Sequence, residues 1–228
     1  MHIVKMDNAK LIAQQAGLSL ESRDDGLVLA CGDMELRGDF SRMAPRLKQG
    51  ALQREMLVKA AKVKDAGDCP LAVDATAGLG EDSLLLAAAG FRVLLFERNP
   101  VTAALLADAL DRGVQDPRLA PVVARMRLAG SNSVEALPRL EETPDVILLD
   151  PMFPAKHGDA RAKKKLQLLQ HLEQPCEDES ALLDAAFAAQ PRKIVVKRPL
   201  KGPWLANRKP SYSLNGKTVR YDVHVIAR

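Results

Sequence analysis

The stretch Asp145-Val146-Ile147-Leu148-Leu149-Asp150-Pro151-Met152-Phe153-Pro154 joins an apolar run to a turn that contains an acid and an aromatic ring. The length and β-branched content of the run predict a buried strand of a parallel sheet. Asp150 and Phe153 follow at its carboxyl end, in a turn stiffened by two prolines. Because ligands of open α/β sheets bind at the carboxyl ends of the strands, we expect a binding site here. An acid beside a stacking ring suits a flat ring that carries an amine, such as a nucleobase.

Patterns typical of strands and helices alternate on both sides of this stretch, from residue 71 onward. Four more strands are predicted at residues 71–74, 92–96, 125–129 and 193–197. The helices predicted around them cover residues 81–89, 100–112, 134–140, 161–173 and 177–189. A turn at Asn215-Gly216 predicts a final hairpin of residues 211–214 and 217–226. The alternation predicts an α/β fold with a mostly parallel sheet, to which the C-terminal hairpin adds antiparallel strands.

The first 65 residues follow a different pattern and are expected to form a small region of their own. A short helical pattern covers residues 8–16, and three short strands are predicted at 18–20, 26–30 and 34–36. Residues 42–64 have the periodicity of a basic helix. We therefore predict an N-terminal α+β region of residues 1–65, followed by an α/β domain of residues 66–228.

The predicted strand 71–74 ends in a glycine-containing turn, Asp74-Ala75-Thr76-Ala77-Gly78-Leu79-Gly80. Glycines let the backbone approach a ligand closely. A dinucleotide site would have a third glycine where this chain has Ser83, and a helix N-terminus free for pyrophosphate. Instead, Glu81 and Asp82 occupy that position and would repel a pyrophosphate. S-adenosylmethionine (SAM) has no phosphate and carries a positive sulfonium and an amino group, so an acidic loop suits it better.

Side chains after the next two predicted strands extend this cofactor hypothesis. Glu97 ends the second strand and is placed to bond both hydroxyls of a ribose. Asn132 and Ser133 follow the third strand and are placed to hold the edge of an adenine. The residue pattern therefore predicts a cofactor site that contains Asp74, Gly78, Gly80, Glu81, Asp82, Glu97, Asn132 and Ser133.

The turn after Leu149 suits chemistry on an exocyclic amine, which is a poor nucleophile because its lone pair is conjugated with the ring. Asp150 is predicted to accept one hydrogen of such an amine, and a backbone carbonyl of Pro151-Met152 to accept the other. Phe153 is predicted to stack on the ring, which contributes about 1–3 kcal/mol per base. Much of the acceleration should then come from aligning nitrogen, methyl carbon and sulfur. Asp150, Pro151 and Phe153 are the predicted catalytic residues.

Positive charge is concentrated after this turn. Residues 1–150 carry 18 Lys and Arg against 22 Asp and Glu, whereas residues 151–228 carry 15 against 7. This asymmetry indicates a polyanionic partner. The predicted contacts to its phosphates are Lys156, Arg161, Lys163, Lys164, Lys197 and Arg198.

The composition argues against several other classes of protein. Hydrophobic residues make up 47% of the chain and charged residues 27%, which is typical of a folded globular protein. No apolar run approaches the ~18 residues of a membrane helix, and the N-terminus lacks the apolar segment of a signal peptide. The 3 cysteines are scattered, so neither a disulfide framework nor a metal site is expected. We expect a cytoplasmic protein without a bound metal.

Four stretches resemble the RsmJ family of bacterial methyltransferases: residues 74–80, 97–100, 149–154 and 195–199. The string Asp-Pro-Met-Phe-Pro, followed by Lys156 and the pair Lys163-Lys164, is the most specific of them. The resemblance implies a class I SAM-dependent methyltransferase fold. It implies methylation of the exocyclic N2 of a guanine in 16S ribosomal RNA, either as naked RNA or in the small ribosomal subunit. It also implies a cofactor site lined by Glu81, Asp82, Glu97, Arg98, Asn132, Ser133 and Asp150.

The sequence departs from this family before residue 70. The family has a basic, glycine-rich segment with a His-Arg pair ahead of the first strand, whereas residues 44–50 contain one glycine and no histidine. Three alternatives remain open at this point. The protein could methylate another amine, such as adenine in nucleic acid or a glutamine side chain; it could be a nicotinamide-dependent oxidoreductase; or it could bind RNA without catalysis.

Overall fold

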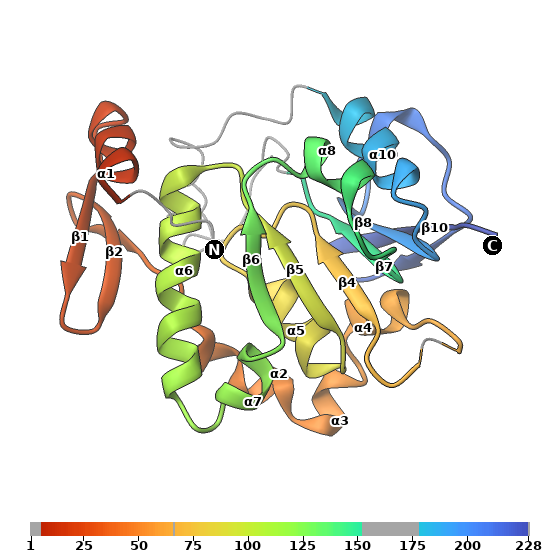
Figure 1. Ribbon diagram of the computed structural model, residues 1–228, viewed down its shortest axis with the longest axis horizontal. Coiled ribbons are helices and arrows are strands. Elements are labelled where there is room, and N and C mark those ends of the chain that lie inside the picture. The colour runs from red at the N-terminus through yellow and green to blue at the C-terminus, as the bar shows by residue number, and fades with distance from the viewer. Residues whose placement is uncertain (1–5, 66, 152–177, 228) are drawn as a thin grey trace.

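The computed structural model describes residues 6–65, 67–151 and 178–227. The centre of the protein is a sheet with the strand order β6-β5-β4-β7-β8-β10-β9 (Figure 1). Strands β4 to β8 pair in parallel, and β10 pairs antiparallel with both β8 and β9. The strands are β4 (Leu71–Asp74), β5 (Arg92–Phe96), β6 (Met126–Gly130), β7 (Val146–Leu149), β8 (Lys193–Pro199), β9 (Tyr212–Asn215) and β10 (Val219–Val225). The predicted α/β class, with a mostly parallel sheet and antiparallel C-terminal strands, is confirmed.

Helices cover both faces of this sheet because the side chains of a strand alternate between the faces. In β7, Val146 and Leu148 share one hydrophobic core with side chains of α4 and α5. Ile147 and Leu149 share the core of the other face with α8 and α10. All four side chains are fully buried, which explains why the sequence of β7 is apolar throughout. The helices on the two faces are α4 (Met56–Ala61), α5 (Glu81–Ala88), α8 (Ser133–Ala136) and α10 (Glu179–Ala188).

Helix α6 (Pro100–Gln115) separates the large sheet from a small N-terminal sheet, which lies beyond α6 at the left of Figure 1. Leu106 and Ala109 of α6 pack in the core of the large sheet. Val101 and Leu105 pack against the small sheet instead. The elements of this N-terminal unit are α1 (Met6–Gln15), β1 (Ser19–Arg23), β2 (Gly26–Cys31) and β3 (Met34–Leu36).

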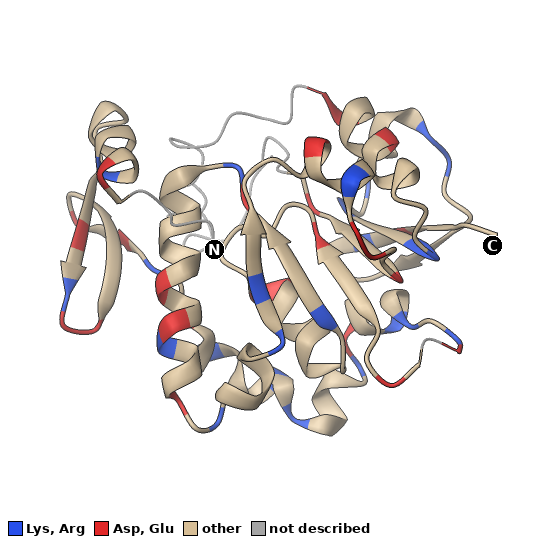
Figure 2. Cartoon of the chain, in the orientation of Figure 1, with Lys and Arg blue, Asp and Glu red and all other residues tan. Residues whose placement is uncertain are grey.

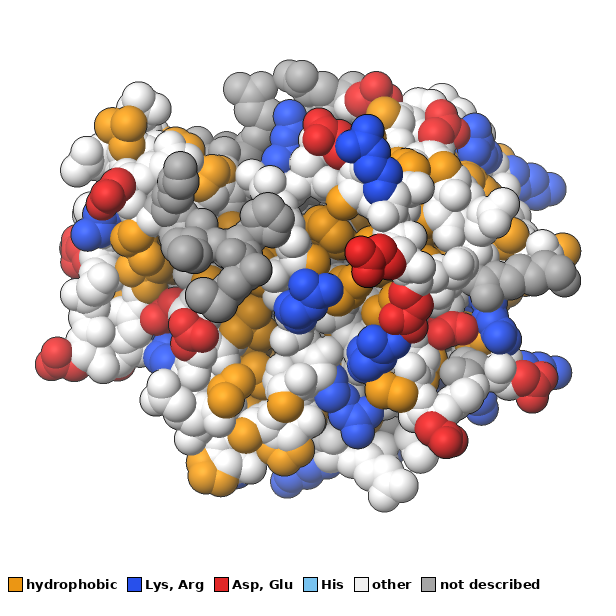
Figure 3. Space-filling model, viewed as in Figure 1, with side chains coloured by type: hydrophobic (Ala, Val, Ile, Leu, Met, Phe, Trp, Pro, Cys, Tyr) orange, Lys and Arg blue, Asp and Glu red, His pale blue; other side chains and the backbone are white. Residues whose placement is uncertain are grey.

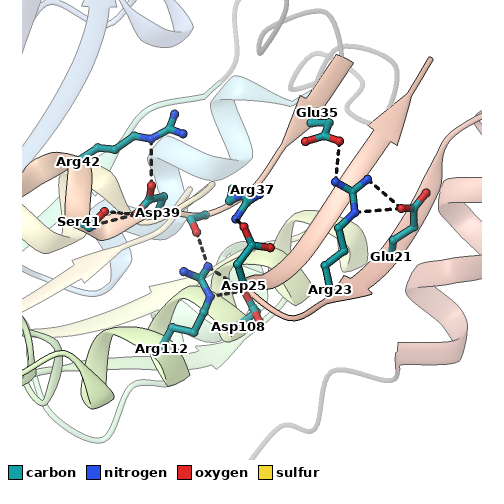
Figure 4. A network of polar contacts seen from close by, with 11 residues as sticks. Glu21, Arg23, Asp25, Glu35, Arg37, Asp39, Ser41, Arg42, Asp108 and Arg112 are labelled. Carbon is teal, nitrogen blue, oxygen red and sulfur yellow. Dashed lines mark hydrogen bonds and ion pairs between the residues drawn. The ribbon is translucent and has the colours of Figure 1, made fainter. Parts of the chain in front are cut away.

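Polar contacts accompany the apolar packing at this junction (Figure 4). Arg112 of α6 donates to the carboxylate of Asp108 and to the carbonyl oxygen of Gly38, just after β3. Arg23 bridges two carboxylates within the small sheet (Figure 4). Exposed ion pairs of this kind contribute little to stability. We therefore attribute the attachment of the small sheet to α6 mainly to its apolar contacts.

Residues 42–64, expected as one basic helix, form short helical segments. The segments of this region are η1 (Phe40–Met43), α2 (Ala44–Leu47), α3 (Gln49–Leu52) and α4 (Met56–Ala61). Pro45 lies in the first turn of α2, and the backbone is extended at Lys48 (ψ 134°) and at Glu55 (ψ 128°). These breaks let Leu52 and Leu57 reach the core that α5 shares with the large sheet. The predicted domain boundary at residue 65 stays a prediction.

Helix α6 also differs from its prediction, because it continues through Gly113 to Gln115. A Cβ atom at Gly113 would lie 2.9 Å from Cγ2 of Val123 and 3.2 Å from Cδ2 of Phe40. The glycine therefore allows close packing against α7 (Ala120–Val123) and does not end the helix.

The other predicted helices have mixed outcomes. The helix expected at 134–140 is divided into α8 and η2 (Leu137–Arg139), and the one at 177–189 is confirmed as α10. The helix expected at 161–173 lies outside the described residues. A further 3-10 segment, η3 (Leu205–Asn207), follows β8. Within the described ranges, no helix combines the length and the apolar character needed to cross a membrane.

Candidate active site

Three neighbouring strands, β4, β7 and β8, place charged side chains at or near their carboxyl ends: Asp74, Asp150 and Lys197. The turns after β4 and β7 are joined directly, because the N–H of Asp150 donates to Oγ1 of Thr76 at 2.6 Å. The glycine-containing turn and the turn at Asp150 therefore belong to one site. In Figure 1 this site lies at the edge to which the arrows of β4 and β5 point.

The ammonium group of Lys197 lies between two carboxylates. Its Nζ is 2.6 Å from Oδ2 of Asp82, in the first turn of α5, and 2.9 Å from Oδ2 of Asp150. Burial by itself would lower the pKa of Lys197, but the two carboxylates outweigh it and raise this pKa above its ordinary value. Lys197 is therefore a fixed cation within the site. The ammonium group is already engaged by both carboxylates. The predicted contact of Lys197 with RNA stays a prediction.

Asp150 combines access from solvent with a perturbed acidity. Its side chain keeps 37% of its surface exposed, so a ligand can reach it. Burial of the remainder raises the pKa of Asp150, Lys197 opposes that rise, and Asp82 adds to it. A carboxylate with a raised pKa accepts a proton more readily than an ordinary aspartate. Pro151, the next residue, is buried and fixes the direction of the turn.

Asp74 lies under the site and is 1% exposed. Its Oδ2 accepts a hydrogen bond from the hydroxyl of Ser83 (2.6 Å), and its Oδ1 accepts one from the N–H of Thr76 (3.2 Å). Burial raises the pKa of Asp74 to about 7, the bond from Ser83 opposes the rise, and Asp82 adds to it. The bond to Asp74 gives position 83 a role that a glycine could not fill.

The shifted pKa of Asp74 predicts a stability that depends on pH. Between 3.8, its ordinary pKa, and about 7, the folded protein retains a proton that the unfolded chain has released. The proton on Asp74 therefore stabilises the folded protein. Its contribution to the free energy of unfolding, at most about 4 kcal/mol, is fully present below pH 4 and is lost as the pH rises through 7. In urea unfolding at pH 5 and pH 8, Asp74→Asn should flatten this dependence. Equal pH dependence in the wild type and the variant would contradict the assignment.

The carboxylate of Glu97 is fixed by the backbone at the end of β5. Its Oε2 accepts the N–H of Gly78 and its Oε1 accepts the N–H of Asn99, both at 2.7 Å. Gly78 has a left-handed backbone (φ +54°), with no atom within 4 Å of the position of a Cβ. A fixed acid beside an open glycine turn suits the two hydroxyls of a ribose.

Gly80 has a different role from Gly78, and paired alanine substitutions should separate them. Its φ is +78°, and a Cβ would lie 2.7 Å from Cδ1 of Leu106 and 3.3 Å from Cζ of Phe40. We expect Gly80→Ala to lower the free energy of unfolding by about 2–4 kcal/mol, through strain and overpacking together. Gly78→Ala should cost only about 1–2 kcal/mol, from its positive φ, and should weaken cofactor binding instead. Urea unfolding and calorimetric titration measure the two effects; equal losses of stability would contradict this distinction.

The other predicted cofactor residues lie around the same edge of the sheet. Glu81 and Arg98 are exposed, at the start of α5 and after β5. Asn132 caps α8, where its Oδ1 accepts the N–H of Glu135 at 3.4 Å. Ser133, the first residue of α8, is 7% exposed. Their contacts with the cofactor stay predictions.

Arg198, predicted to contact phosphates, is buried inside the protein. Its side chain has no exposed surface, and it donates to the carbonyl oxygen of Pro203 (2.8 Å) and to Oε1 of Glu179 (3.2 Å). A guanidinium enclosed in this way does not fit the predicted phosphate contact. The other predicted residues of this group, and the stacking ring, lie outside the described residues: Phe153, Lys156, Arg161, Lys163 and Lys164.

Two residues of the site were missed by the sequence analysis. Thr76 supplies the hydroxyl that holds the backbone of Asp150. Tyr221 of β10 pairs opposite Lys197 of β8 and is 6% exposed. Burial and the nearby Asp82 raise the pKa of Tyr221, so it stays a neutral phenol beside the charged groups. Only the antiparallel register of β8 and β10 brings Tyr221 here, and no local sequence pattern reports that register.

Comparisons with known proteins show the family to which the chain belongs. A family model described as SAM-dependent methyltransferase matches residues 2–226. The chain belongs to this family. The ribosomal RNA small subunit methyltransferase J of Aeromonas salmonicida is 47% identical, over 81% of this chain and 74% of that protein. The protein of the same name from Thioalkalivibrio sulfidiphilus is 41% identical, over 96% of this chain and 89% of that protein.

A solved structure extends the comparison of this methyltransferase to its fold. It is a SAM-dependent methyltransferase from Neisseria gonorrhoeae, with a TM-score of 0.71 and 29% identity, covering 96% of this chain and 92% of that chain. The predicted class I fold, the resemblance to the RsmJ family and SAM as the cofactor are confirmed.

The residues of this methyltransferase also fit SAM chemically. Glu97 and the first turn of α5, with Glu81 and Asp82, flank the glycine turn, and acids suit a ligand that carries a sulfonium, an amino group and ribose hydroxyls. A pyrophosphate at the start of α5 would face Glu81 and Asp82 and be repelled. The nicotinamide-dependent alternative is therefore set aside, since a nicotinamide dinucleotide contains that pyrophosphate.

Proposed function

We propose that this methyltransferase transfers the methyl group of SAM to the exocyclic N2 of a guanine in RNA of the small ribosomal subunit. The names of its relatives support this class of substrate. The observation that carries the proposal is the position of Asp150, which is partly exposed, joined to the glycine turn through Thr76 and paired with Lys197. A substrate of this kind also puts the protein in the cytoplasm.

In this proposal Asp150 orients the amine and then takes its proton. SAM, when bound, supplies an electrophilic methyl group. The carboxylate of Asp150 accepts a hydrogen bond from the amine and holds it with its lone pair directed away from the ring. Once the nitrogen carries its new methyl group it bears a positive charge, and its proton passes to Asp150. The raised pKa of Asp150 favours this transfer, and Lys197 keeps the carboxylate ionised beforehand.

The rest of the turn and the basic segment complete the proposed site. A carbonyl oxygen of the segment Pro151-Met152 accepts the second hydrogen of the amine, and Phe153 stacks on the guanine ring. The basic side chains that follow hold the phosphates on either side of the inserted base. Those proposed phosphate contacts are Lys156, Arg161, Lys163 and Lys164.

Labelled methyl transfer tests the proposal. Purified protein and labelled SAM are incubated with small ribosomal subunits, and separately with naked 16S RNA, from cells that lack the protein. The expected product is N2-methylguanosine at one position, found by mapping the modified nucleoside. Label in adenine or in a protein glutamine would support a different N-methyltransferase. RNA binding without any transfer would support a non-catalytic protein.

A further inference from the structure

A concave surface lies at the opposite end of the strands from the active site. It is an open groove of about 750 Å³, which we call the basic groove. Lys193 begins β8, so the groove is roughly 13 Å along the strand from Lys197, at about 3.3 Å per residue. The residues that line the basic groove are Lys59, Lys62, Val63, Lys64, Arg192, Lys193, Val225 and Ile226.

Two cations at the start of β8 hold the wall of this groove in place. Nζ of Lys193 donates to the carbonyl oxygens of Ala60 (3.2 Å) and Lys62 (2.6 Å), at the end of α4 and just after it. Arg192 donates through Nη1 to the carbonyl oxygen of Lys64 (2.9 Å). The segment after α4 is therefore fixed to the large sheet by bonds that use its backbone, which leaves its lysine side chains outside.

Those lysines supply positive charge, and no acidic residue is among those that line the groove. Lys59, Lys62 and Lys64 are exposed, and none of the three forms an ion pair with any residue that the structure describes. Asp145, at the start of β7, is already paired with Arg192 at 3.2 Å. Figure 2 shows basic positions on α4, and both basic and acidic positions on the loop after it. On the face shown in Figure 3, basic and acidic side chains are interspersed.

We propose that the basic groove binds the sugar–phosphate backbone of structured RNA, away from the point where the base enters the active site. Exposed ammonium groups attract phosphates, and the apolar side chains of Val63, Val225 and Ile226 can pack against ribose. The groove and Lys197 lie at opposite ends of β8. An RNA that reaches both must pass around the helices that cover this strand, for which a folded ribosomal RNA is large enough and a free nucleoside is not. The identity of this RNA rests on the proposed function.

The test is the triple variant Lys59→Ala/Lys62→Ala/Lys64→Ala, with Lys10→Ala/Arg127→Ala/Arg139→Ala as a control that removes three exposed cations elsewhere. Affinity for naked 16S RNA and for a short RNA duplex is measured as a function of salt concentration. The groove variant should reduce the slope of log affinity against log salt by about 2–3, and the affinity by about tenfold or more. In methyl transfer, KM for RNA should rise while kcat and SAM binding stay unchanged. The control variant should show a smaller loss of RNA affinity and a smaller rise in KM for RNA.

The possible outcomes separate the basic groove from the proposed function. Unchanged RNA affinity and salt slope in the groove variant would contradict the proposal that the basic groove binds RNA, even if the wild type methylates RNA normally. If the groove variant binds RNA more weakly but the wild type methylates no ribosomal RNA, the groove is supported as an RNA site and the proposed function is contradicted. A defect with assembled subunits but not with naked RNA or duplex would point to an acidic protein partner, and would also overturn the groove as an RNA site.

Discussion

Replacing Asp150 by alanine is expected to lower kcat for methyl transfer by about 10²–10⁴-fold, the usual contribution of a positioned acid or base. The backbone N–H of residue 150 still donates to Thr76, so the turn keeps its position. Cofactor binding should therefore weaken only modestly. Single-turnover transfer of labelled methyl groups measures the rate, and calorimetric titration measures the affinity for SAM.

The variant Asp150→Asn separates the two tasks that we assign to this residue. An asparagine keeps an oxygen that accepts a hydrogen bond, but it does not take up a proton. Its kcat should therefore fall between those of the wild type and Asp150→Ala. Asp184→Ala, which removes an exposed carboxylate of α10 paired with Arg208, is the matched control. Full turnover by Asp150→Ala would remove Asp150 from the mechanism.

Much of the fold and the shared edge of the site followed from the sequence because both depend on local patterns. The apolar runs of β4 and β7 end in Asp74 and Asp150, and the carboxyl ends of parallel strands lie at one edge of a sheet. That rule was sufficient to bring the glycine turn and Asp150 together. The pattern of residues 42–64 was less informative, because apolar residues at helical spacing fit one helix or several short segments equally well.

The roles of Lys197 and Arg198 show what the sequence could not provide. Both were grouped as phosphate contacts because they are adjacent cations at a strand end. Adjacent residues of a strand point to opposite faces of the sheet. Lys197 therefore meets Asp82 of α5, and Arg198 meets Glu179 on the other side. The ion pair of Lys197 with Asp82 joins residues 115 positions apart, and only the packing of α5 determines it.

The structure consequently predicts a large effect for Lys197→Met. Without the ammonium group, the carboxylates of Asp82 and Asp150 face each other without a cation between them. The pKa of Asp150 should then rise further, so less of it is ionised at neutral pH. We expect kcat/KM at pH 7 to fall by about 10–100-fold, which corresponds to about 1.4–2.7 kcal/mol. Activity should partly recover as the pH rises, because the remaining Asp150 ionises.

A second substitution distinguishes this electrostatic role from RNA binding. Adding Asp82→Asn to Lys197→Met removes the carboxylate that raises the pKa of Asp150, so kcat at pH 7 and saturating SAM should recover in part. Removing one partner of a buried pair also costs up to about 3 kcal/mol of stability, and Asp82→Asn should restore some of it. Lys201→Met, at an exposed position just after β8, is the control for loss of a lysine. If Lys197 instead holds a phosphate, Lys197→Met raises KM for RNA with an unchanged pH profile, and Asp82→Asn rescues nothing.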